Sequence, residues 1–188
     1  LAYDLGRDVD NVNSFLHLCG RTDANDIYCA NFIIRNSTFH HLYHGLIEAR
    51  CWTGIKEQVA APTVEVTNCT FDYMGFMADG VWTGTKKGGQ RYLFEFLGYA
   101  AKAEITLSRT IVGEVRTNNN NIRPTAFNNA TLTCTATFKS TDTAFDSKFT
   151  ATATNLSSGQ TFPKRAEYDF TPTTDYANFF GNGDPRWQ

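Results

Sequence analysis

The stretch Phe32-Ile-Ile-Arg-Asn-Ser-Thr-Phe39 returns 32 residues later as Val64-Glu-Val-Thr-Asn-Cys-Thr-Phe71. The two copies share the asparagine, the threonine and the final phenylalanine at matched positions. Before the asparagine, apolar residues recur at every second position, which is the period of a β-strand with one buried face. A repeat of a whole strand predicts an architecture built from stacked copies of one unit.

Two weaker copies follow, Ile105-Thr-Leu-Ser-Arg-Thr-Ile111 and Leu132-Thr-Cys-Thr-Ala-Thr-Phe138. We align Ser108 and Thr135 with the repeated asparagine, so the steps between copies are 32, 40 and 27 residues. A propeller blade or a helical hairpin needs a unit of fixed size, whereas a solenoid tolerates loops of different length between its strands. The predicted fold class is all-β, a right-handed parallel β-helix of about four rungs.

Matched side chains of successive rungs lie one strand spacing apart, roughly 4.8 Å, and therefore form ladders. Asn36 and Asn68 suit the bend that ends a strand, because asparagine tolerates a left-handed backbone and its amide can bond the amide of the next rung. The alignment also predicts a ladder of Phe39, Phe71, Ile111 and Phe138.

Each ladder strand is followed by a short apolar segment that we expect to form a second strand of the same rung. These segments are Gly45–Ala49, Tyr92–Leu97 and Thr143–Phe145, and Ser14–Cys19 resembles the second strand of a preceding rung. We therefore expect residues 1–146 to form rungs of a coil that is cut short at its N-terminus. Residues 147–188 would add one strand, at Phe149–Thr154, and a Pro- and aromatic-rich tail that caps the last open edge.

Composition argues against two classes of partner. The net charge of −2 and the pI near 6.1 leave no basic surface for nucleic acid. The apolar run Tyr92–Ala101 is shorter than the roughly 20 residues that a membrane-spanning helix needs.

The five cysteines are scattered, with no CxxC and no zinc-ligand spacing, so we expect most of them to be reduced and buried.

The pattern x-Ile-x-x-Asn-(Ser/Cys)-Thr-Phe, followed by a short apolar strand, resembles the pectate-lyase-like superfamily of right-handed β-helices. With the closing Gly183-Asp-Pro-Arg-Trp187, the chain is similar more narrowly to the C-terminal β-helix domains of surface lipoproteins that gut anaerobes encode beside polysaccharide-uptake genes. The repeat that carries this resemblance spans roughly residues 14–146. The resemblance implies an extracellular or outer-surface module, part of a longer surface protein, whose partner is a polysaccharide or oligosaccharide.

The cluster His40-His41-Leu42-Tyr43-His44 follows the first ladder strand. The alignment puts His40 beside Asp72 and His41 beside Tyr73, which predicts a solvent-facing patch of His, Asp and Tyr side chains. Imidazoles this close together can bind a metal or exchange protons near neutral pH. They can equally decorate a turn, and we predict no metal site because no carboxylate accompanies them at ligand spacing.

Trp52 and Trp82 flank the two longest interruptions of the repeat, Cys51–Pro62 and Trp82–Gln90. Exposed indoles beside a parallel sheet can stack on the apolar faces of sugar rings while polar neighbours bind the hydroxyls. The alternative is that both indoles cover the ends of the apolar interior, because Trp is usually mostly buried. The polar groups that we assign to carbohydrate binding are Glu48, Arg50 and Asp79 near the indoles, and His40, His41, Asp72 and Tyr73.

The resemblance also implies an enzymatic alternative, a lyase that removes the proton next to a uronate carboxylate with a Lys or Arg base and a calcium ion held by acidic residues. Loop cations are present at Arg50, Lys56, Lys86, Lys87 and Arg91, but the carboxylates Glu48, Asp72 and Asp79 are dispersed. Our leading expectation is a module that binds or presents complex polysaccharide without a cofactor. The calcium-dependent lyase is the alternative, and a rigid spacer is a third possibility.

Overall fold

The structure is a computed structural model that describes residues 2–5, 15–19, 30–42, 45–50, 62–74, 91–97, 99, 101–115, 124–143, 145 and 148–188. Its strands are β1 (Ala2–Leu5), β2 (Leu16–Cys19), β3 (Asn31–Leu42), β4 (Ile47–Arg50), β5 (Thr63–Asp72), β6 (Arg91–Leu97), β7 (Ala103–Ser108), β8 (Ile111–Val112), β9 (Pro124–Asn128), β10 (Ala130–Thr135), β11 (Phe138–Lys139) and β12 (Thr152–Ala153). The C-terminal part contains the helix α1 (Ser158–Thr161) and 3₁₀ turns at Arg165–Glu167, Ala177–Phe179 and Pro185–Trp187.

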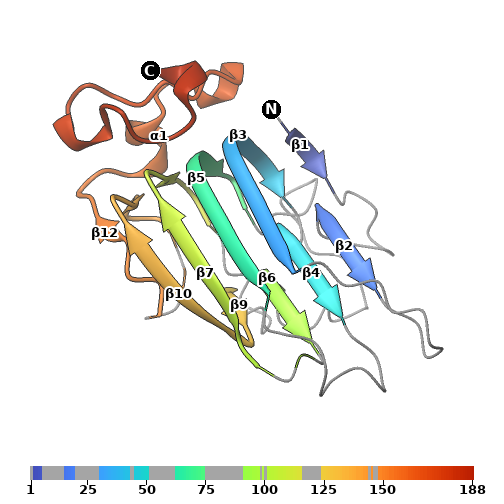
Figure 1. The fold of residues 1–188 in the computed structure, drawn as a ribbon. Helices are drawn as coiled ribbons and strands as arrows, with labels where there is room; N and C mark the ends of the chain where they lie inside the picture. Colours follow the sequence, from blue (N-terminus) through green and yellow to red (C-terminus); the bar gives the residue numbers. More distant parts are fainter. Residues whose placement is uncertain are drawn as a thin grey trace.

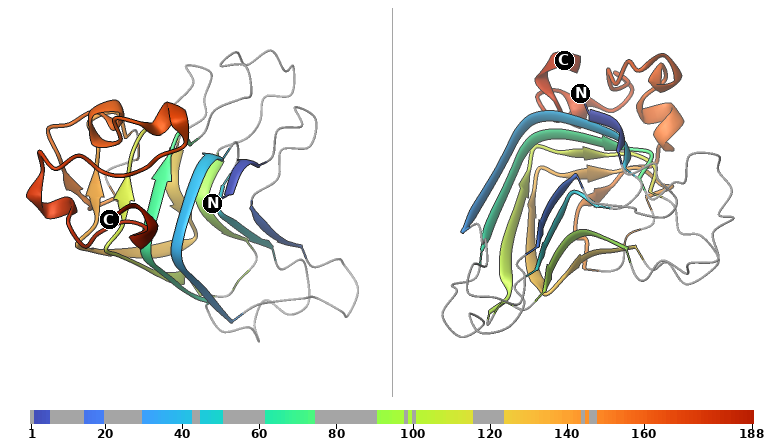
Figure 2. Two further views of the ribbon diagram at one scale, coloured as in Figure 1. Left: turned by 90° about the horizontal axis from the view of Figure 1, so that it is seen from above. Right: turned by 90° about the vertical axis from the view of Figure 1, so that its right-hand side faces the viewer.

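The strands form two parallel sheets (Figure 1). The larger sheet has the order β1-β3-β5-β8-β11-β12, with β7 beside β5 and β10 beside β7, and the smaller sheet has the order β2-β4-β6-β9. Every pairing between the described strands is parallel. From β1 to β7 the chain changes sheet after each strand. Figure 2 shows the strands curling into a half-barrel, so the fold is all-β and parallel.

The two strong copies of the repeat pair as predicted. β3 lies beside β5 with Phe32 opposite Val64 and Phe39 opposite Phe71, and the rings of Phe39 and Phe71 stack with their centroids 5.2 Å apart. At the bend, Asn36 and Asn68 have left-handed backbones, with φ of 52° and 53°. Asn68 Nδ2 donates to Asn36 Oδ1 at 3.3 Å, which confirms the predicted amide ladder.

The third copy is shifted by one residue from the predicted alignment. Phe71 pairs with Val112 and Thr70 pairs with Ile111, so the step from the second copy to the third is 41 residues and not 40. Successive side chains of a strand point to opposite faces, and a shift of one residue therefore exchanges inside and outside. Val112, not Ile111, continues the ladder of phenylalanines. Phe138 pairs with Ile111 and so stands outside this ladder as well.

The later bends follow the same shift. They lie at Arg109 and Ala136, with φ of 49° and 44°, each one residue after the position that the sequence alignment gave to the asparagine. Ser108 and Thr135, the residues aligned with asparagine, instead pair with each other as the last residues of β7 and β10. Neither Arg nor Ala favours a left-handed backbone, so the stacking of the neighbouring strands imposes these bends.

Three of the four predicted second strands are confirmed. Ser14–Cys19, Gly45–Ala49 and Tyr92–Leu97 contain or overlap β2, β4 and β6, which pair in this order in the smaller sheet. In the predicted strand Thr143–Phe145, Thr143 forms an isolated parallel bridge to Val115 and Phe145 is not in a strand, while Ala144 lies outside the described residues. The position beside β6 is taken by β9, which precedes the fourth copy.

The shift in register creates two apolar clusters. The inner one contains the ladder Phe39, Phe71 and Val112, together with Val66, Leu107, Phe94 and Phe96 among others. The outer one contains Ile111, Phe138, Phe162, Phe170 and Phe179, with Leu156, Tyr176 and Trp187 packed against it. Ile111 and Phe138 therefore present an apolar outer surface that the C-terminal tail covers.

The tail crosses the outer face of the larger sheet (Figure 1, orange to red). β12 does add a strand beside β11, although it is shorter than the predicted Phe149–Thr154. From there the backbone N–H of Thr141 donates to Leu156, the N–H of Gly183 donates to Arg109, and Trp187 Nε1 donates to Thr38 Oγ1. The tail thus runs from the last copy of the repeat back to the first.

Candidate functional site

The residues of the predicted His, Asp and Tyr patch come together where β3 and β5 end. His40 pairs with Asp72, and His40 Nδ1 lies 3.6 Å from Asp72 Oδ2. The following residues, His41 and Tyr73, both have left-handed backbones, with φ of 56° and 57°. Their rings meet edge to face with centroids 4.3 Å apart. The juxtaposition predicted from the repeat is therefore confirmed.

The predicted exposure of this patch is wrong for two of its members. Asp72 is fully buried and His40 is 5% exposed. Two residues of the tail cover the imidazole of His40, since the ring centroids of Tyr168 and Phe170 lie 5.7 and 5.0 Å from it. The repeat alone predicts that these groups face solvent, because nothing in it indicates that the tail returns to this side.

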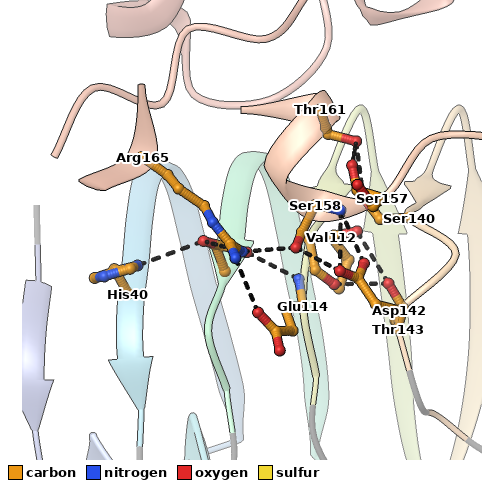
Figure 3. A network of polar contacts seen from close by, with 12 residues as sticks. His40, Val112, Glu114, Ser140, Asp142, Thr143, Ser157, Ser158, Thr161 and Arg165 are labelled. Carbon is orange, nitrogen blue, oxygen red and sulfur yellow. Dashed lines mark hydrogen bonds and ion pairs between the residues drawn. The ribbon is translucent and has the colours of Figure 1, made fainter. Parts of the chain in front are cut away.

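The carboxylate of Asp72 is held by the backbone and by the tail (Figure 3). The backbone N–H of Glu114 donates to Asp72 Oδ1 at 2.8 Å, and Arg165 Nη1 lies 3.3 and 3.4 Å from the two carboxylate oxygens. Gly113 permits this arrangement, because a Cβ at that position would lie 2.2 Å from Asp72 Oδ1. A buried carboxylate is costly without a cation, so Arg165 ties the tail to the sheet.

Arg165 joins several segments through one guanidinium. Its Nη2 donates to Glu114 Oε2 at 3.1 Å, and its Nη1 donates to Ser158 Oγ at 2.6 Å. The guanidinium carbon lies 5.7 Å from the centroid of the Tyr73 ring. The amide and hydroxyl of Ser158 in turn donate to the carboxylate of Asp142. One polar network therefore joins β5, the segments after β8 and β11, and the tail.

We call this group the seam cluster, because it lies where the tail meets the larger sheet. It consists of His40, His41, Asp72, Tyr73, Glu114, Arg165 and Tyr168. Sequence reasoning found the four members that belong to the two strong copies. It missed Glu114, Arg165 and Tyr168, which stand outside the recognised repeat strands. The need for a cation at this place becomes visible only once the structure shows that Asp72 is fully buried, so the sequence carries no signal that identifies Arg165.

The seam cluster is better suited to binding than to proton transfer. Arg165 already bonds two carboxylates, which leaves it little capacity to act as a base or to bind an anionic substrate. His40 Nδ1 is buried and has no hydrogen-bond partner, but the ring is enclosed by tail residues. The most exposed member is the ring of Tyr168, at 45%, and the rings of His41 and Tyr73 are half-buried, as is Arg165.

A second contact fixes the end of the tail to the outer surface of β3 and β5. Asp184 is fully buried, its Oδ2 accepts from Thr38 Oγ1 at 2.7 Å, and its N–H donates to Thr70 Oγ1 at 3.0 Å. Thr38 Oγ1 also accepts from Trp187 Nε1 at 2.6 Å. Burial alone would raise the pKa of Asp184, but hydrogen bonds from Arg186 and Thr38 outweigh it and lower the pKa below its ordinary value.

Of the other residues predicted for a carbohydrate site, the structure describes Glu48 and Arg50, and both belong to β4 of the smaller sheet. Glu48 is 3% exposed in β4 beside Glu95 of β6, so it is not a solvent-facing group. Arg50 ends β4 opposite Leu97. Trp52, Trp82, Asp79, Lys56, Lys86, Lys87, Tyr43 and His44 lie outside the described residues.

In the part of the chain that the structure describes, no group of three or more His, Cys, Asp or Glu side chains is placed to hold a metal ion. Within the same residues, no helix has the length and apolar character to cross a membrane.

Comparisons with protein-family models, with curated proteins and with solved structures find no match for this chain.

Proposed function

We propose that the chain is a right-handed parallel β-helix module that binds or presents complex polysaccharide at the outer cell surface or outside the cell. The parallel pairing and the repeated change of sheet support the coil, because strands that follow one another in this way wind round a shared interior. Crossovers between parallel strands are right-handed in nearly all proteins, which supports the handedness. The resemblance of the repeat supports the compartment and the partner.

The observation that carries polysaccharide binding is the set of accessible rings in the seam cluster. The rings of Tyr168, His41 and Tyr73 gather at the end of two stacked strands, above a buried Asp72 whose charge Arg165 balances. Planar rings with polar edges suit sugars, because the C–H faces of a pyranose pack on the ring and the hydroxyls bond the edges. The buried ion pair holds these rings in place before a ligand arrives.

The experiment is a titration of the intact chain with a panel of plant, pectic and host-derived polysaccharides, followed by calorimetry. Tyr168 has a left-handed backbone with φ of 59°, so Tyr168→Asn removes the ring while keeping a residue that tolerates this conformation. We expect it to weaken binding roughly three- to tenfold, the effect of one aromatic contact. Ile33→Asn is the matched control, because Ile33 is 62% exposed on the outer face of β3.

Several outcomes would reject the proposal. If the unmodified chain binds no polysaccharide of the panel, the proposal is rejected. It is also rejected if Tyr168→Asn, Trp52→Ala and Trp82→Ala all bind every such polysaccharide as tightly as the unmodified chain does. The Trp variants test the indoles predicted from sequence. Rising ultraviolet absorbance from an unsaturated uronate product, in the same mixtures with calcium, would favour the lyase alternative over simple binding.

A further inference from the structure

The C-terminal tail contains a pocket that is separate from the accessible rings of the seam cluster. Its volume is about 340 Å³, near the lower end of the range for small-molecule sites, roughly 300–1,000 Å³. Its walls include Pro172, Tyr176, Phe180 and Trp187. All of its lining residues belong to the tail, at positions 171–188.

The pocket is built before any ligand enters. The indole of Trp187 is fixed because its Nε1 donates to Thr38 Oγ1 of β3 at 2.6 Å, and its ring packs on Phe170 at 5.8 Å between centroids. Tyr176 packs on Phe138 and Phe179, with centroids 5.9 and 4.8 Å away. Two walls are therefore anchored to the outer apolar cluster, so a ligand would lose little binding energy to ordering them.

One wall faces the solvent instead. Phe180 is 89% exposed and is the most exposed large apolar side chain among the described residues. As an exposed lining residue of an apolar pocket, the Phe180 ring offers additional apolar surface on which a ligand could pack. The lining also contains Ala177, Phe179, Gln188 and three threonines, Thr171, Thr173 and Thr174, which carry hydroxyl groups. The Gln188 amide already bonds the tail backbone, since its Oε1 accepts from the N–H of Gly181 and its Nε2 donates to the carbonyl of Asn182.

We propose that this pocket binds a sugar unit with an apolar substituent, specifically the methyl group of a 6-deoxyhexose within a polysaccharide. This inference rests on the proposed polysaccharide-binding function and assigns it a second subsite. The aromatic walls would pack on the methyl group and the C–H face of the ring, and the threonines would bond the hydroxyls. A fully hydroxylated hexose would bury its C6 hydroxyl against apolar walls without a partner.

Phe170 connects the pocket to the seam cluster. Trp187, which forms one wall, packs on Phe170, and Phe170 packs on His40 at 5.0 Å between centroids. One buried ring therefore supports both the pocket wall and the covered imidazole. A polysaccharide that occupied both places would gain affinity from two contacts on one chain of sugars.

The test uses two pairs of methyl glycosides that differ only at C6. Methyl α-L-fucoside is compared with methyl α-L-galactoside, and methyl α-L-rhamnoside with methyl α-L-mannoside, by saturation-transfer NMR and titration of the intact chain. We expect saturable binding of at least one 6-deoxy sugar, about tenfold tighter than its hydroxylated counterpart. Phe180→Asp should abolish this binding, whereas Phe180→Tyr and the distant Ile33→Asp should leave it.

The failure of this inference is distinguishable from failure of the proposed function. If neither 6-deoxy sugar binds, if both members of each pair bind equally, or if Phe180→Asp binds normally, the pocket assignment is wrong. Polysaccharide binding that depends on Tyr168 would then still stand. Because Phe180 is exposed, Phe180→Asp should unfold at the same urea concentration as the unmodified chain, which makes a loss of binding attributable to the pocket.

Discussion

At the scale of single residues, Gly183 allows the tail to dock. Its φ is +84°, and a Cβ there would lie 2.9 Å from Thr70 Oγ1 and 3.1 Å from Ile111 Cδ1. We expect Gly183→Ala to lower the free energy of unfolding by about 2–3 kcal/mol, from backbone strain and this close approach. Gly159→Ala is the matched control, because no atom lies within 4 Å of its added Cβ. Equal urea midpoints for the two variants would contradict this docking geometry.

Asp184 makes the stability of the folded chain, with its docked tail, depend on pH. Its pKa is lowered in the folded chain, so its contribution to stability is present above the ordinary pKa of about 3.9 and is lost as the pH falls through the folded value. The thermal midpoint of the unmodified chain should therefore exceed that of Asp184→Asn above pH 5. This difference should shrink below pH 4. If the difference in thermal midpoint stays constant from pH 7 to pH 3, the charge of Asp184 does not contribute to stability.

The buried thiol of Cys69 should be unreactive in the folded chain. It is fully buried and free, and burial raises its pKa to about 12. The reactive thiolate of Cys69 is therefore scarce at pH 8, and an alkylating reagent cannot reach the buried sulfur. Alkylation at pH 8 followed by peptide mapping should leave Cys69 unlabelled in the native chain and label it in urea. Rapid native labelling would mean that β5 does not face the inner core as described.

At the scale of elements, Arg165 is the main charged contact between the tail and β5. Arg165→Met should lower the free energy of unfolding by about 2–4 kcal/mol, because it leaves the carboxylate of Asp72 buried without a cation. Lys164→Met should change it by less than about 0.5 kcal/mol, since Lys164 is exposed and lies 4.0 Å from Asp169. Urea denaturation measures both variants.

The double variant Arg165→Met/Asp72→Asn separates the charge from the packing. It should recover part of the loss, because the neutral amide is cheaper to bury and its oxygen can still accept from Glu114. If Arg165→Met were no less stable than Lys164→Met, the network drawn in Figure 3 would not hold the tail.

The sequence predicts β3 and β5 well because their bends are encoded locally. Asn36 and Asn68 favour the left-handed backbone on their own, and matching them sets the register of the whole pair. At the third copy, Thr110 resembles the repeated threonine, and aligning it places Ile111 beside Phe71. The bend in fact lies at Arg109, which only the stacked neighbours impose, so the register there could not be obtained from local preference.

At the scale of the whole molecule, the candidate site depends on contacts between residues far apart in the sequence. The pairing of His40 with Asp72 could be predicted, because both stand four residues after the repeated asparagine. Their burial could not, since the covering residues Arg165, Tyr168 and Phe170 belong to a tail without repeat or regular period. An apolar outer surface made by Ile111 and Phe138 explains why the tail returns.

The most direct test is a methyl NOE spectrum of the intact chain labelled at Ile and Val methyl groups. The structure predicts contacts of Val112 methyls with the ring of Phe71, and of the Ile111 δ1 methyl with Gly183 and the rings of Phe138 and Phe179. Contacts of Ile111 with Phe71, and none between Ile111 and the tail, would contradict both the parallel register and the docked tail.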